Sequence, residues 1–359
     1  MEYNWYKREL KDKYNLLQKL YRTTSNEKEK IIILNTIRTI EICLSKEEVP
    51  REIDELLEKD YIELSKTRFI WPYIKNIAKI NNDFIPDFSS DNTSLSKKDI
   101  IELLHDFFKN GTTKEMYELF CKIYNENKKN IHFFENSLTN YIGETIYLEY
   151  FKKTYIQVFK SFSFEDLNTF AHEFGHAVQF NTNFQINYFH ELNIYVEIIS
   201  IFFELICNEY FVKEEFKWPA IITSYTTLDE YLEDAKNLGN EFVLLDTISI
   251  KKHENKLQLR KNIEKLISEL SFEDITSIMC LKPSRDYIYV FAFLVATNLF
   301  MIYKMDRDKA FYLVNTIINL SGKLTCEEYF HELEKLELLD TNKTQDYTNF
   351  IHNRSRKLK

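Results

Sequence analysis

Glycine and proline are scarce in this sequence, with only five of each among 359 residues. Because both residues interrupt helices and build turns, their scarcity argues against a loop-rich chain. Internal repeats and low-complexity tracts are absent too. Together with long amphipathic stretches, these absences predict a mainly α-helical protein, and the 44% hydrophobic content is enough for a sizeable core.

A secretory signal and a long membrane-spanning run are also missing. Residues 1–9 are polar and charged, with no apolar segment behind them. The longest apolar run, Ile288 to Tyr303, is shorter than the roughly 18 residues of a span and contains Thr297 and Asn298, so we expect a buried helix. We therefore expect a cytoplasmic protein that does not bind membranes. The five widely spaced cysteines suit buried thiols in a reducing compartment and form no metal-ligand pair: Cys43, Cys121, Cys207, Cys280 and Cys326.

Positive charge is in deficit, since the formal net charge is -9. Nucleic-acid binding depends on neutralising phosphates with Lys and Arg, so we expect no nucleic-acid partner. The charge is compatible with basic ligands, although it does not select them by itself.

Periodicity places the elements, and a polar segment suggests a boundary. The turn-rich stretch at 81–94 separates an N-terminal helical region, residues 1–95, from a second region, residues 96–359, which contains the motif described next. Helices are predicted at about 2–21, 26–44, 52–66, 97–108, 113–125, 228–238, 255–270 and 309–320.

The most informative segment is His172-Glu173-Phe174-Gly175-His176, which has the form H-E-x-x-H. Four residues turn an α-helix by about 400°, so His172 and His176 lie on nearly the same face. Both imidazoles can then bind one metal ion, while Glu173 can take a proton from a water that the metal activates. The alternative is an ordinary solvated helix surface, because this composition gives such a pentapeptide by chance in about one or two chains in a hundred.

The context of the motif favours a helix. Ser163 is a capping residue with an acid three positions later, and apolar residues then recur at spacings of three and four as far as Phe180. The motif therefore lies in the middle of a predicted helix at about 164–180.

A third metal ligand is expected, because catalytic zinc usually has three protein ligands. Glu197 lies in the segment 192–206, which is apolar around the whole helix and should be buried. A buried lone carboxylate is costly, so coordination to a dication explains it, with an interhelical salt bridge as the alternative. Glu204 lies seven residues later on the same face and could orient a metal-bound histidine, or could equally form a salt bridge.

Upstream of the motif, the runs 143–150 and 154–159 alternate β-branched and aromatic residues, which predicts a β-hairpin. An edge strand beside a metal site can bind an extended peptide through main-chain hydrogen bonds.

Together these residues resemble the thimet oligopeptidase and oligoendopeptidase F family of zinc peptidases. The family has an H-E-F-G-H or H-E-L-G-H helix, a glutamate ligand in a following helix and a further glutamate seven residues beyond it, and its strand pair resembles 143–159. The resemblance implies a mainly α, zincin-type metallopeptidase with a small hairpin or sheet beside the active-site helix. It also implies one Zn²⁺ held by His172, His176 and Glu197, with Glu173 as general base and a peptide as substrate.

The resemblance covers residues 135 to 300, and the sequence departs from it in two places. The late segment 283–293 lacks the family's histidine and glycine, and Gln179 stands where a third histidine often occurs. Tyr289 and Tyr287 remain as donors to the oxyanion of the reaction. The alternative for both is a place in the core, since the chain has 23 Tyr and 29 Phe.

The sequence thus predicts a zinc-dependent endopeptidase that cleaves oligopeptides or a peptide precursor. Two alternatives stay open: a dedicated leader or propeptide maturation protease, and a non-catalytic peptide-binding relative. A zinc carboxypeptidase is disfavoured because no His-Glu-Ser motif follows the helix.

Overall fold

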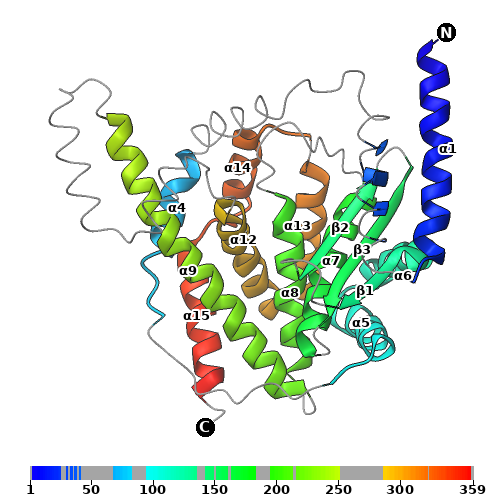
Figure 1. Cartoon of the computed structure of the whole chain (residues 1–359). Helices are drawn as coiled ribbons and strands as arrows, with labels where there is room; N and C mark the ends of the chain where they lie inside the picture. Colours follow the sequence, from blue (N-terminus) through cyan, green and yellow to red (C-terminus); the bar gives the residue numbers. More distant parts are fainter. Residues whose placement is uncertain are drawn as a thin grey trace.

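The computed structural model shows a mainly helical chain with one small sheet (Figure 1), as the sequence predicts. It describes residues 2–25, 30, 33–34, 36–38, 40–41, 68–82, 94–135, 142–148, 151–160, 163–182, 195–212, 216–250, 286–321 and 323–356. The predicted helices at 52–66 and 255–270 lie outside these ranges, as do Cys43, Cys280 and most of the stretch at 81–94. Among the described cysteines, Cys207 is buried and Cys121 and Cys326 are half-buried.

In chain order the elements are α1 (Glu2–Thr23), η1 (Arg68–Ile70), α4 (Trp71–Ile77), α5 (Lys97–Gly111), α6 (Lys114–Asn127), η2 (Lys128–Asn130), β1 (Ile131–Glu135), β2 (Gly143–Leu148), β3 (Lys153–Lys160), α7 (Phe164–Asn181), α8 (Val196–Phe211), α9 (Lys217–Ile250), α12 (Asp286–Met305), α13 (Arg307–Leu320), α14 (Cys326–Lys335) and α15 (Thr341–Arg356).

The sheet has three strands in the order β1-β3-β2, so β2 is an edge strand. The predicted hairpin is present as the antiparallel pair β2 and β3, in which Thr145 pairs with Ile156. Strand β1, which the sequence did not predict, runs parallel to β3 and pairs Ile131 with Ile156.

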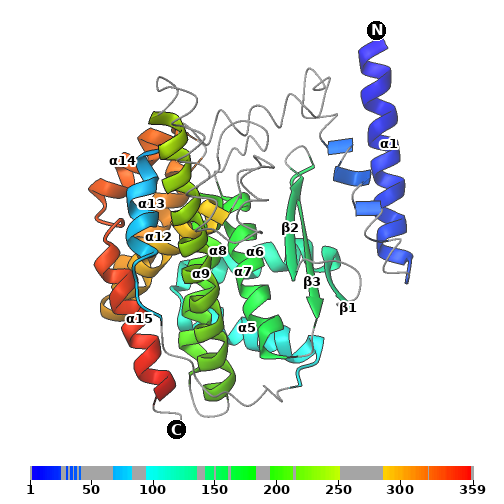
Figure 2. The ribbon, with the colours of Figure 1, turned by 60° about the vertical axis from the view of Figure 1, so that its left-hand side comes forward.

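The two faces of β2 contact different helices, because successive side chains of a strand point to opposite faces. Thr145 hydrogen-bonds to α7, and Tyr147 stacks near Phe180 of α7, with ring centroids 6.0 Å apart. Ile146 and Leu148 instead belong to a second buried cluster with Tyr14 and other residues of the N-terminal region. The sheet is therefore enclosed between α7 and α1 (Figure 2).

The described N-terminal residues contact the rest of the molecule at two separate places. Helix α1 lies beside the sheet, whereas α4 lies beside α9, and the two views place them on opposite sides (Figures 1 and 2). The boundary at residues 95 and 96 stays a prediction.

The centre of the helical part is formed by α8 and α12, which are apolar around their circumference. In α8 the side chains of Ile198, Phe202 and Phe203 are fully buried, which is the environment that the sequence predicts for this helix. Helix α12 is longer than the run seen in the sequence, and over Tyr287–Met305 it has the length and composition of a membrane span. It packs against α8, α9, α13 and α15, and 67% of that stretch is buried, as in a core helix.

Candidate active site

Helix α7 carries the H-E-x-x-H motif and begins where the sequence predicts. The Ser163 hydroxyl accepts a hydrogen bond from the Glu165 backbone amide at 3.2 Å, which caps the helix. Acidic residues in the first turn suit the positive end of the helix dipole. The imidazoles of His172 and His176 follow one turn apart, with ring centroids separated by 5.1 Å.

Gly175 allows α8 to approach α7 closely. A Cβ at this position would lie 2.6 Å from the Cα of Ser200 and 3.0 Å from the carbonyl oxygen of Ile199. No side chain larger than a hydrogen fits there without moving one of the helices. The approach brings Glu197, one turn before Ser200, to the two histidines.

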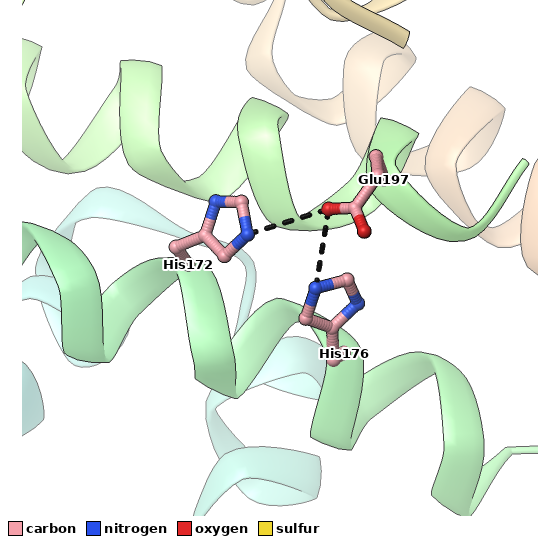
Figure 3. Close-up of side chains that lie close together, drawn as sticks. All are labelled: His172, His176 and Glu197. Atoms are coloured by element: carbon pink, nitrogen blue, oxygen red, sulfur yellow. Dashed lines mark ion pairs between the residues drawn. The ribbon is translucent and has the colours of Figure 1, made fainter. Parts of the chain in front are cut away.

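The three side chains meet at one point (Figure 3). Oε2 of Glu197 lies 3.4 Å from Nε2 of His172 and 3.2 Å from Nε2 of His176. The potential ligand atoms all lie within 4.8 Å of one another. Two atoms bound to a tetrahedral zinc ion are about 3.3 Å apart, given bond lengths of about 2.0–2.2 Å. The two distances to Glu197 match this spacing, so the three side chains could hold one metal ion.

Glu204 supports His172 from the side away from Glu197. Its Oε2 lies 3.2 Å from Nδ1 of His172, while its Oε1 accepts hydrogen bonds from Asn168 at 3.0 Å and from Thr227 at 2.8 Å. A carboxylate on Nδ1 fixes the ring so that Nε2 faces the ligand point. The sequence singled out Glu204, but Asn168 and Thr227 gave no signal beyond being polar residues in apolar surroundings.

Electrostatics couples the histidines to the carboxylates. Burial opposes the charged form of His172, but the hydrogen bonds to Glu197 and Glu204 outweigh it and hold the pKa of His172 well above its ordinary value. Burial likewise acts to raise the pKa of Glu197, but the neighbouring His176 and His172 lower it overall. The cluster thus favours positive charge between its carboxylates, and a metal dication would supply that charge as a proton does.

Glu173 lies on the side of α7 that faces β2, with its residue 5% exposed. Its Oε2 accepts a hydrogen bond from the Thr145 hydroxyl at 2.7 Å. Burial raises the pKa of Glu173, although the nearby histidines and Thr145 act in the opposite direction. A carboxylate whose pKa is raised is a stronger base than an ordinary glutamate.

The two predicted tyrosines differ in exposure. Tyr287 is 2% exposed, whereas Tyr289 is 38% exposed, so Tyr289 is the more accessible phenol. The sequence missed Tyr231 of α9, whose ring stacks on Phe293 with centroids 4.7 Å apart. Burial, followed by the carboxylates of Glu204 and Glu197, raises the pKa of Tyr231, which also interacts electrostatically with Tyr289.

Gln179 makes a structural contact with the residue that leads into α8. Its side-chain amide donates to the carbonyl oxygen of Tyr195 at 3.1 Å, immediately before α8 begins. It therefore helps to hold the start of the helix that carries Glu197.

Comparisons with known proteins give a shared fold but no sequence match: no protein-family model and no curated protein matches the chain. A solved PZ peptidase A with an inhibitor is 14% identical with a TM-score of 0.52, over 91% of this chain and 65% of that one. A Bacillus anthracis protein assigned as an oligoendopeptidase F is 15% identical, with a TM-score of 0.50 over 92% and 64% of the chains. A Chlamydophila abortus protein assigned as a peptidase is 14% identical, with a TM-score of 0.50 over 96% and 62%. The chain thus spans slightly less than two thirds of the length of these structures and shares their fold.

Proposed function

From this shared fold we propose that the chain is a shortened, divergent zinc peptidase of the oligoendopeptidase F type, acting as an endopeptidase on oligopeptides or on a peptide precursor. One observation carries the proposal. The Nε2 atoms of His172 and His176 lie 3.4 and 3.2 Å from a single oxygen of Glu197, and all three belong to helices of a fold shared with solved peptidases.

His172, His176 and Glu197 would hold the zinc ion. When bound, zinc supplies Lewis acidity, which makes water nucleophilic near neutral pH and polarises a carbonyl group. Glu173 accepts the proton of the attacking water and returns it to the leaving amine. Glu204 keeps His172 in the orientation and tautomer in which Nε2 can bind.

Tyr289 is our candidate for the donor to the oxyanion, because its phenol is accessible whereas Tyr287 is buried. A phenol O–H that points at the carbonyl oxygen stabilises the negative charge as the tetrahedral intermediate forms. Replacing Tyr289 by Phe should then reduce kcat more than it changes KM.

The test is digestion of a mixed peptide library by the zinc-loaded protein, with products identified by mass spectrometry. We expect internal cleavage that stops when a chelator is added and that is lost in E173Q, while E173Q retains zinc. A zinc-free wild-type protein after purification without chelator, or an E173Q variant as active as wild type, would refute the proposal.

The same experiment separates the alternatives. Inertness towards the library combined with cleavage of one natural precursor indicates a dedicated maturation protease. Zinc binding with no cleavage of either substrate indicates a non-catalytic peptide-binding protein.

A further inference from the structure

The edge strand β2 contacts the carboxylate of Glu173 with two consecutive residues of its α7-facing side. The hydroxyl of Thr145 lies 2.7 Å from Oε2 of Glu173 and 2.8 Å from the main-chain oxygen of the same residue. A hydroxyl has one hydrogen, so it donates to one of these oxygens at a time. Either way, Thr145 holds Glu173 against the sheet.

Gly143 makes room for the other carboxylate oxygen. A Cβ at this position would lie 2.6 Å from Oε1 and 2.8 Å from Cγ of Glu173, and 2.8 Å from a methyl group of Thr169. The Glu173 side chain therefore occupies the space that any larger residue at position 143 would need. Thr145 therefore holds the carboxylate by a hydrogen bond, and Gly143 leaves the space that the carboxylate occupies.

We propose that β2 positions the general base: Thr145 is a positioning residue for the Glu173 carboxylate, and Gly143 provides the space in which that carboxylate lies. This inference rests on the proposed function, in which Glu173 is the base. A glutamate side chain has several rotamers, and a base that must reach one water gains from being held in a single one.

The position of β2 in the sheet adds a further consequence. Among the described strands, β2 pairs with β3 on one side, and its other side is an edge of the sheet with which an extended peptide can pair. The strand that would align the peptide is then the strand that holds the base. Strand β2 would then position both the peptide bond to be cleaved and the Glu173 carboxylate that accepts the proton.

The test compares T145V, which removes the hydroxyl but keeps the shape, with T145S, which keeps the hydroxyl. We expect T145V to reduce kcat about 10- to 100-fold with less than about a threefold change in KM, as for loss of one hydrogen bond to a charged group. T145S should recover most of the loss, and zinc content should be unchanged in both variants. T316V is the matched control, because the Thr316 hydroxyl donates to the Tyr312 carbonyl oxygen within its own helix, α13.

A second measurement does not depend on turnover. It is a double-mutant cycle on the midpoint of thermal unfolding, with wild type, T145V, E173A and the double variant. We expect the double variant to lose less stability than the two single variants lose when their losses are added. If the unfolding changes are non-additive but the wild-type protein cleaves no peptide, the contact between Thr145 and Glu173 is supported and the proposed peptidase activity is refuted. Additive unfolding changes, or T145V kinetics within about twofold of T145S, would overturn the positioning role.

Discussion

A single glycine determines how closely α7 and α8, the two helices that carry the proposed metal ligands, approach each other. Gly175 packs against the backbone of Ser200, and this contact fixes the distance from His172 and His176 on α7 to Glu197 on α8. The x-x part of an H-E-x-x-H motif is usually read as spacing alone. Here the second of these two residues, Gly175, determines whether Glu197 lies close enough to His172 and His176 to join them at one site.

Replacing Gly175 by Ala should weaken both the fold and metal binding. The added Cβ forces α8 away, and overpacking of this kind costs about 1–3 kcal/mol of stability. Chemical denaturation and zinc competition titration would measure the two effects. G239A is the matched control, because the nearest described atom to a Cβ at Gly239 in α9 is the Ala78 side-chain Cβ, at 3.2 Å. Equal zinc affinity for G175A and wild type would contradict the prediction.

Glu204 contacts Nδ1 of His172, which is one of the proposed metal ligands. Replacing Glu204 by Gln keeps the shape and some hydrogen bonds but removes the charge that holds the Nδ1 proton of His172. We expect zinc affinity to fall about 10- to 100-fold, as for loss of a carboxylate behind a metal-bound histidine. Competition with a zinc chelator measures it, and E118Q on the exposed surface of α6 should bind zinc like wild type.

At the scale of elements, an ion cluster joins the central helix α8 to two of its neighbours. Glu209 of α8 pairs with Lys304 of α12 and with Arg354 of α15, whose NH2 group lies 3.1 Å from Oε1 of Glu209. The guanidinium of Arg354 also lies over the Phe350 ring, 4.1 Å from its centroid. The C-terminal helix is thereby tied to the helix that carries Glu197 and Glu204.

Replacing Arg354 by Ala should destabilise the protein by about 1–3 kcal/mol, between the values for exposed and buried ion pairs. The side chains of Arg354 and Glu209 are mostly shielded, with 25% and 13% exposure. K98A removes a partner of the exposed Lys98–Glu102 pair and should cost less than about 0.5 kcal/mol. Urea denaturation would measure the free energy of unfolding of both variants. Equal losses in R354A and K98A would show that the Glu209 cluster does not stabilise the protein more than an exposed ion pair does.

Elements with a strong local signal were predictable from the sequence, and elements defined by packing were not. Helix α7 has a capping serine and an apolar stripe, and it was predicted to within a residue or two. Helix α15 is rich in Thr and Asn and shows no clear stripe, and β1 is a run of only five residues, so neither was predicted. The core of α9 was predicted at 228–238, but the helix extends over Lys217–Ile250.

The candidate site divides in the same way. His172, Glu173 and His176 follow from a spacing within one helix, and Glu197 from a charge in an apolar helix. Thr145 and Thr227 reach Glu173 and Glu204 from other elements, and contacts across such separations leave no periodic trace in one sequence.

At the scale of the whole molecule, α1 covers the face of the sheet opposite the candidate active site. His132 of β1 lies in this interface, with its ring 4.7 Å from that of Tyr21 and its Nδ1 3.2 Å from Nζ of Lys30. Burial, with Lys30 and Lys97 nearby, lowers the pKa of His132 to about 4. In the folded protein His132 should therefore stay neutral until the pH approaches about 4.

The pH dependence of stability follows from that shift. An unfolded His132 takes up a proton near pH 6.5 and a folded one near pH 4, so between these values the unfolded state binds more protons. Stability therefore falls as pH drops from about 6.5 to 4. Replacing His132 by Gln should flatten this part of the curve and leave the curve above pH 7 parallel to wild type. Thermal unfolding across that range measures it, and parallel curves throughout would contradict the assignment.

The alternation along β2 links the proposed catalytic role of Glu173 to the register of the hairpin. Thr145 faces α7, while Glu144 beside it faces the other way and forms an ion pair with Arg38 at 3.0 Å. A slip of one residue in the pairing with β3 would exchange these faces and put a second carboxylate against Glu173. If Glu173 is the base, a molecule with the shifted register would be inactive. Peptide cleavage would then indicate that β2 and β3 had paired in their native register.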